Sequence, residues 1–155
     1  MKNNKGFTLI EIIATLVLSG ILAGIAGMGL VQMSKSFVFT KQNMGTLQKG
    51  QLAMLRILKE FTNISSISAS NNTSITFVSE HRSGGTITYA LSLSGTTLLL
   101  QKDGGDQNIL VNNVNDFDLL YYDTYDADSA NTWTNGTSSL IQATLDLNGA
   151  GGVVS

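Results

Sequence analysis

The residues whose types and spacing could do chemistry begin near the N-terminus, at Gly6-Phe7 and Glu11. Glu11 is the only formal charge between Phe7 and Val31, inside a long apolar run. An ionised carboxylate at membrane depth is costly unless it is paired, so such a residue is functional by expectation. One isolated helix offers it no partner. The simplest partner is a free α-amino group, created by cleaving the chain nearby and supplied by a neighbouring chain.

A second candidate is the acidic segment 123–131, in which Asp123, Asp126 and Asp128 are closely spaced. Carboxylates in a loop suit the oxygen preference of calcium. However, Ala130 stands where an EF-hand-like loop has a ligand, and no glycine or distal glutamate follows in register. We therefore expect a solvated acidic loop and no cofactor, with calcium binding as the alternative.

The sequence offers little for catalysis, and we expect no enzyme. His81 is the only histidine, and it lies beside Glu80 and Arg82 near a turn, where an exposed structural role is expected. The chain has no cysteine, which excludes disulfides and thiol nucleophiles. Neither a Gly-x-Ser-x-Gly elbow nor a phosphate-binding loop occurs. Trp133, in a Thr/Asn-rich loop, either anchors a partner or plugs the end of a sheet.

The apolar segment 7–31 must position Glu11, and we expect a transmembrane helix. At about 1.5 Å per residue it spans about 37 Å, enough for a hydrocarbon core of roughly 30 Å. Lys2 and Lys5 precede it and place the N-terminus in the cytoplasm. A removed secretory signal peptide and a plain signal anchor are the alternatives. Its glycines, from Gly20 to Gly29, either let helices approach closely or soften the helix.

Segment 32–64 has helical periodicity and predicts an amphipathic continuation, giving one helix of about 50–55 residues. We expect it to be interrupted or softened near Gly45 and Gly50. The stripe expected to pack on the sheet of the head comprises Met33, Phe37, Met44, Leu47, Met54, Leu55, Leu58 and Phe61.

Segment 65–155 predicts a β-rich globular head. Ser65–Thr73 is interpreted as a linker, and six short strands follow it, with Asp103-Gly104-Gly105-Asp106 as a hairpin turn. The fold class is therefore α+β: a long N-terminal helix packed on a small antiparallel sheet. Aspartates gather in the last third of a chain of net charge −2, which argues against nucleic acid as the main partner.

The heptapeptide Lys5-Gly6-Phe7-Thr8-Leu9-Ile10-Glu11 resembles the class III signal of type IV pilins and type II secretion pseudopilins. The resemblance implies a cationic leader, residues 1–6, that prepilin peptidase removes between Gly6 and Phe7, and N-methylation of Phe7. It also implies that Glu11 neutralises the Phe7 amine of the neighbouring subunit. The partners implied are other pilin or pseudopilin subunits, the peptidase and the assembly platform of the inner membrane, with the head outside the cytoplasm.

The head narrows this resemblance. Segments 114–123 and 140–147, with Trp133 between them, resemble the J-type minor pseudopilins and the W-type minor pilins, which implies a minor, tip-type structural subunit. Those families usually continue past the final strand, so a last strand is expected to be absent here or the chain to be shortened. A major or DNA-uptake pilin is one alternative. A signal-anchored binding domain or enzyme outside the membrane is the alternative from another class.

Overall fold

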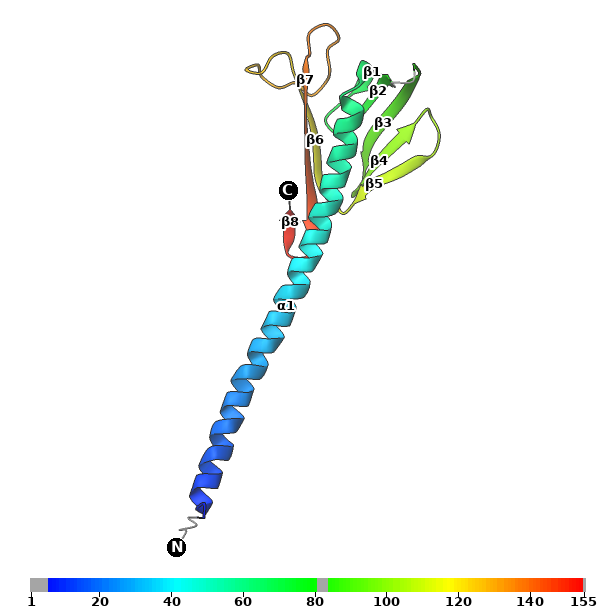
Figure 1. Ribbon diagram of the computed structural model, residues 1–155. Helices are drawn as coiled ribbons and strands as arrows, with labels where there is room; N and C mark the ends of the chain where they lie inside the picture. The colour runs from blue at the N-terminus through cyan, green and yellow to red at the C-terminus, as the bar shows by residue number, and fades with distance from the viewer. Residues whose placement is uncertain (1–5, 81–83, 155) are drawn as a thin grey trace. The chain divides into compact units, whose positions relative to one another are not determined.

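The computed structural model describes residues 6–80 and 84–154, and it divides into two compact units, Met1–Lys41 and Gln42–Ser155. One helix, α1 (Leu9–Phe61), precedes all the strands, which confirms the α+β class (Figure 1). The strands are β1 (Ile64–Ser70), β2 (Ser74–Glu80), β3 (Thr86–Ser94), β4 (Thr97–Lys102), β5 (Gln107–Asn112), β6 (Val114–Tyr122), β7 (Leu140–Gly149) and β8 (Gly152–Val154).

Helix α1 has 53 residues, as the periodicity predicted, but it continues through Gly45 and Gly50. The expected interruption is therefore wrong. Gly50 has a packing role instead, because a Cβ built on it would lie 2.9 Å from Cδ1 of Leu147 on β7. Its missing side chain lets the helix approach that strand closely. Glycine lowers helix stability by about 1 kcal/mol relative to alanine, and the contact with β7 offsets that loss.

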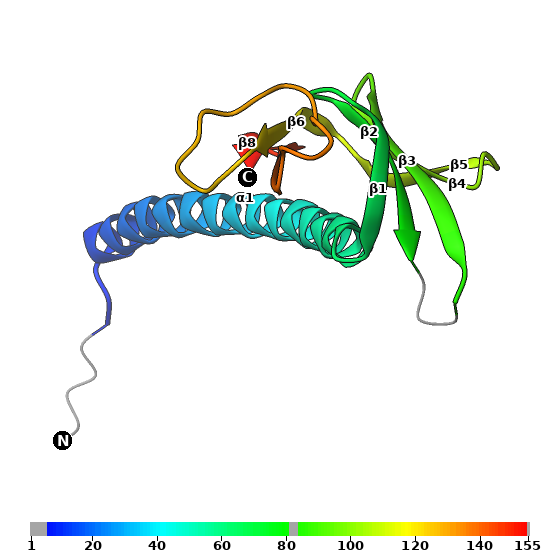
Figure 2. The same cartoon turned by 90° about the horizontal axis from the view of Figure 1, so that it is seen from above.

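The strands form two antiparallel sheets. The large sheet has the order β1-β2-β3-β4-β5, and the small sheet has the order β6-β7-β8. The expected turn between β4 and β5 is confirmed, and Asp103 and Gly104 adopt the positive φ angles of a tight turn there. Two strands were not expected. Segment 65–73, interpreted as a linker or first loop, instead supplies most of β1, which follows directly on the end of α1 (Figure 2).

The prediction failed at β1 because only Ile67 of this strand is buried and four of its residues are serine. At the edge of a sheet, hydrogen bonding to one neighbour is enough to form a strand without a strong apolar alternation. β8 was missed for a related reason: it pairs only three residues of β7, Leu147–Gly149. The structure therefore contains one short strand after β7, in a segment where the sequence predicted none.

The core lies between α1 and the two sheets. Its buried side chains include Phe77, Tyr89, Phe117, Leu119 and Tyr121. Backbone bonds join the sheets: the amide of Leu119 donates to the carbonyl of Asn72 at 2.7 Å, and the amide of Val114 donates to that of Thr96 at 2.9 Å.

The helix does not use the predicted apolar stripe as its buried face. Ala53, Ile57 and Glu60 are buried, whereas Leu55 and Leu58 are more than half exposed. Met54 and Phe61 are partly buried, so the prediction holds for these two only. The strands approach α1 closely at Gly50, and the buried face there continues through Ala53 to Ile57 and Glu60 rather than through Leu55 and Leu58. The stripe members left exposed are Met33, Phe37, Met44, Leu47, Leu55 and Leu58.

Candidate functional site

Glu11 closes the first turn of α1. The backbone amide and the hydroxyl of Thr8 both donate to Oε2 of Glu11, each at 2.9 Å. In return, the amide of Glu11 lies 3.4 Å from Oγ1 of Thr8. This reciprocal arrangement is a capping box, with Thr8 as the N-cap and Glu11 three residues later. It satisfies amide groups that the start of a helix otherwise leaves without partners.

The expectation that Glu11 has no partner in its own helix is therefore wrong. The sequence contains the pattern that would have revealed it, because Thr-x-x-Glu before an apolar run marks a helix start. Both bonds from Thr8 reach the same carboxylate oxygen. In the part of the chain that the structure describes, Oε1 of Glu11 has no hydrogen-bond donor. One oxygen thus holds the helix start, and the other is open to a second group.

Gly6 and Phe7 lie before the helix, in chain without regular secondary structure. Phe7 is 81% exposed, and a side chain at position 6 would meet nothing within 4 Å in this chain. The Gly6–Phe7 bond is therefore sterically accessible. The lysines of the leader, Lys2 and Lys5, lie outside the described residues.

The helix after Glu11 presents an apolar surface with nothing packed on it. Every described residue up to Gln42 is exposed, and among the described residues α1 is long and apolar enough to cross a membrane. The four glycines from Gly20 to Gly29 have open space where a side chain would lie. This open space is compatible both with close packing of a second helix against these glycines and with a locally softer helix.

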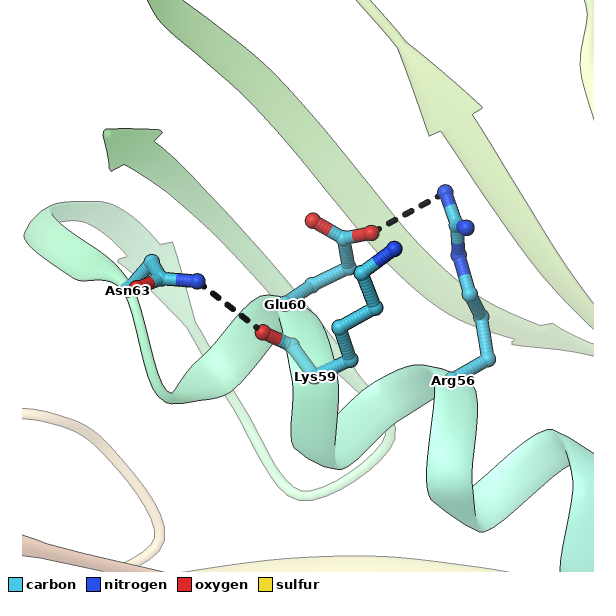
Figure 3. A network of polar contacts seen from close by, with 4 residues as sticks. All are labelled: Arg56, Lys59, Glu60 and Asn63. Carbon is cyan, nitrogen blue, oxygen red and sulfur yellow. Dashed lines mark hydrogen bonds and ion pairs between the residues drawn. The ribbon is translucent and has the colours of Figure 1, made fainter. Parts of the chain in front are cut away.

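The head unit holds one buried charge that the sequence reading missed. Glu60 is 3% exposed, and its Oε1 lies 3.0 Å from a guanidinium nitrogen of Arg56, one turn earlier on α1 (Figure 3). Burial raises the pKa of the Tyr89 hydroxyl, and the negative charge of Glu60 raises it further. The side-chain amide of Asn63 donates to the carbonyl of Lys59 at 3.3 Å and caps the same helix end (Figure 3). The spacing of four residues between Arg56 and Glu60 indicated the ion pair, but nothing in the sequence indicated its burial.

The other candidates do not assemble into a reactive site. Across residues 6–80 and 84–154, no three His, Cys, Asp or Glu side chains converge, so the structure does not bring Asp123, Asp126 and Asp128 together as a metal cluster. Asp123 instead accepts a long bond, 3.4 Å, from Ser138. His81 lies outside the described residues.

Trp133 supports the end of the small sheet. Its ring lies edge-on to Tyr121 at 6.2 Å, its backbone amide donates to the hydroxyl of Ser70 at 2.7 Å, and its indole N–H donates to Asn135. Beneath it, the hydroxyl of Tyr121 donates to the carbonyl of Asn71 at 3.1 Å. Burial raises the pKa of Tyr121 to about 12. Trp133 thus covers a buried polar contact between the two sheets.

Residues 1–27 match the family model of the prokaryotic N-terminal methylation motif. No curated protein and no solved structure matches the chain. The N-terminus therefore carries a class III signal of the type IV pilin kind. With the apolar helix that follows, the motif supports a membrane-anchored, structural subunit of the pilin or pseudopilin type, which fits assembly with other pilins.

Proposed function

We propose that this chain is a minor, tip-type subunit that initiates a pilus-like or type II secretion filament. Prepilin peptidase cleaves it between Gly6 and Phe7, and the new Phe7 amine is methylated. The observation that carries this proposal is the methylation motif at residues 1–27, which leads directly into an exposed apolar helix. The accessible position of Phe7 before that helix supports the processing step.

In the proposed assembly step, Glu11 has two tasks. Oε2 keeps its bonds to Thr8 and so preserves the helix start. Oε1 faces the α-amino group of Phe7 in the neighbouring subunit, and the resulting ion pair offsets the cost of a carboxylate at membrane depth. The other subunits bind through the exposed apolar surface of α1. The head unit stands outside the cytoplasmic membrane, and the assembly platform of the inner membrane extracts the subunit.

A minor role rests on the resemblance of segments 114–123 and 140–147 to J-type and W-type subunits. These segments form the paired strands β6 and β7, in which Leu119 lies opposite Ala143. A major or DNA-uptake pilin is the second candidate, and abundance in sheared surface fibres favours it over a minor role. Mass spectrometry of the mature N-terminus separates both from a signal-anchored binding domain or enzyme, which would not begin at a methylated Phe7.

Two variants separate the tasks of Glu11. Glu11→Gln keeps the capping box, because glutamine also serves at that position, but it removes the charge. Thr8→Ala keeps the charge and removes the cap, which costs about 1 kcal/mol of helix stability. We expect Glu11→Gln to be inserted and cleaved normally but largely excluded from sheared filaments, whereas Thr8→Ala enters them.

The measurement is the ratio of subunit in sheared filaments to subunit in membranes, with the cleaved N-terminus checked by mass spectrometry. Normal incorporation of Glu11→Gln contradicts the ion pair proposed for Glu11. Loss of Thr8→Ala as well as Glu11→Gln would show that the helix start is required for assembly in addition to the charge, whereas loss of Thr8→Ala alone would assign the role of Glu11 to the helix start rather than to its charge.

A further inference from the structure

A groove in the head unit remains unused by the proposed function. It has a volume of about 630 Å³ and lies at the C-terminal end of α1, beside Leu58 and Phe61. One wall is the first half of β1, Ile64–Ile67, and the other is Ser139 with the start of β7, Leu140 and Ile141, with Trp133 beside them. This end groove is therefore bounded by one strand from each sheet.

The end groove runs along the edge of β1. Side chains of a strand alternate between its two faces, so a groove that contacts four consecutive residues lies along the strand's edge. β1 is also the terminal strand of the large sheet. At Ser70 the backbone amide of Trp133 donates to the side-chain hydroxyl, so the chain around Trp133 lies beside this end of β1. From Ile64 to Ile67, β1 pairs with β2 on one edge, and no strand among the described residues pairs with its other edge, which faces the groove.

The opposite wall has an open strand edge as well. β7 pairs with β6 along its length, but β8 covers only Leu147–Gly149 on the other side. Within the described chain, the edge of β7 from Leu140 to Asp146 thus has no strand partner. Unpaired backbone groups at a strand edge are a ready template for another strand.

The side chains that line the end groove indicate which kind of ligand it can bind. None of the lining residues is charged. Three of its four hydroxyls already donate within the chain: Thr62 to the carbonyl of Leu58 at 2.7 Å, Ser65 to that of Val78 at 3.2 Å, and Ser139 to that of Thr137 at 3.4 Å. The hydrogen-bonding groups left over are therefore mainly those of the strand edges. The groove therefore suits an uncharged ligand that can form hydrogen bonds with the main chain of a strand edge.

We propose that the end groove binds an extended, uncharged segment of a second protein chain. The segment adds to β1 as a sixth strand of the large sheet and fills the space beside β7. In strand addition, main-chain bonds supply the affinity and the pockets beside the strand supply specificity. β1 suits this role because it has neither the charge nor the proline that commonly protect an edge, although two register shifts limit the regular pairing to a few residues. This contact goes beyond assembly through α1, because it uses only the head unit.

The full chain in detergent micelles allows a direct test. Trp133 is the only tryptophan and lines the end groove, so its fluorescence reports occupancy. The probe is a blocked octapeptide of alternating threonine and valine. We expect a saturable change in emission and slowed amide hydrogen exchange in β1. An octapeptide with glutamate in place of threonine should bind at least about tenfold more weakly, because the uncharged groove offers its carboxylates no partner.

Two lysine substitutions provide the matched pair. Ser66→Lys places a charge in the end groove, whereas Ala69→Lys places the same charge on an exposed position of β1 outside it. We expect Ser66→Lys to weaken binding of the Thr/Val peptide at least about tenfold and Ala69→Lys to leave it unchanged. Equal effects of the two variants overturn the proposal. So does the absence of saturable binding to the unaltered protein at millimolar peptide, or protection confined to strands other than β1.

Discussion

Arg56 and Glu60 show how one charge can be buried in a small core. Glu60 is almost completely buried, while Arg56 is 44% exposed and so keeps part of its hydration. The pair therefore costs less to form than one with both members buried. Glu60 lies on α1 close enough to Tyr89 of β3 for its charge to raise the pKa of the Tyr89 hydroxyl, and a carboxylate without a partner is unfavourable at such a buried position.

Removing the arginine tests this account. Arg56→Ala leaves the buried Glu60 without its cation, and we expect a loss of about 2 kcal/mol in the free energy of unfolding of the head unit. Lys59→Ala, an exposed neighbour on the same helix, should change it by less than about 0.5 kcal/mol. Urea unfolding of the full chain in micelles measures both. An Arg56→Ala variant as stable as Lys59→Ala would show that hydration alone supports Glu60.

The sequence indicated the importance of some single residues and not of others. The motif singles out Gly6, Phe7 and Glu11, because a carboxylate in an apolar run has few explanations, and the processing and assembly roles of these residues stay predictions. The capping role of Glu11 was equally readable and was missed. The burial of Glu60 was not readable, since a glutamate on an amphipathic helix is usually solvated and only the contact with β3 shows otherwise.

At the scale of the elements, α1 and β7 meet through a glycine. Gly50 has no room for a side chain beside Leu147, whereas Gly45, one turn and a half earlier, has nothing within 4 Å. The two glycines occur in the same helix and look alike in the sequence. Only the position of β7 distinguishes them, which is why both were interpreted as points of softness.

Alanine substitutions should separate the two glycines. Gly45→Ala gains helix propensity without a clash, so we expect about 1 kcal/mol of added stability. Gly50→Ala gains the same propensity but presses on the buried side chain of Leu147, and overpacking of this kind costs about 1–3 kcal/mol. We therefore expect Gly50→Ala to be neutral or destabilising in thermal unfolding. If it stabilises as much as Gly45→Ala, the contact with β7 is not close.

The strands were predictable where apolar residues alternate, and β2, β3, β6 and β7 follow that pattern. β1 was not predictable, because its serines give no alternation of apolar and polar residues and the strand forms by pairing with β2. The division of the strands into two sheets could not be predicted from the sequence either. It depends on which strand edges meet, and short antiparallel strands with similar composition do not specify this.

The stability of the head unit as a whole should depend on alkaline pH through Tyr121. Its pKa rises from an ordinary 10.0 to about 12 because it is fully buried. A raised folded pKa means that the unfolded chain loses the proton first. The stabilisation is therefore complete below about pH 10 and is lost as the pH rises toward about 12, by about 2–3 kcal/mol.

Urea unfolding followed by Trp133 fluorescence at about pH 8 and about pH 11.5 measures this loss. Tyr121→Phe should be less stable at the lower pH, because the bond to the Asn71 carbonyl is gone, but it should lose less on going to the higher pH. Tyr89, whose pKa is also raised, leaves a residual dependence in that variant. An unchanged pH dependence in Tyr121→Phe contradicts the assignment.

The bond between Asn43 and Ala150 has a mechanical consequence. Following α1 from its N-terminus, every described residue is exposed until Asn43, whose side-chain oxygen accepts the amide of Ala150 at 2.8 Å. Ala150 lies in the turn between β7 and β8. Tension applied along α1 therefore loads this turn of the small sheet first, before it reaches the end of α1, where the chain continues into β1.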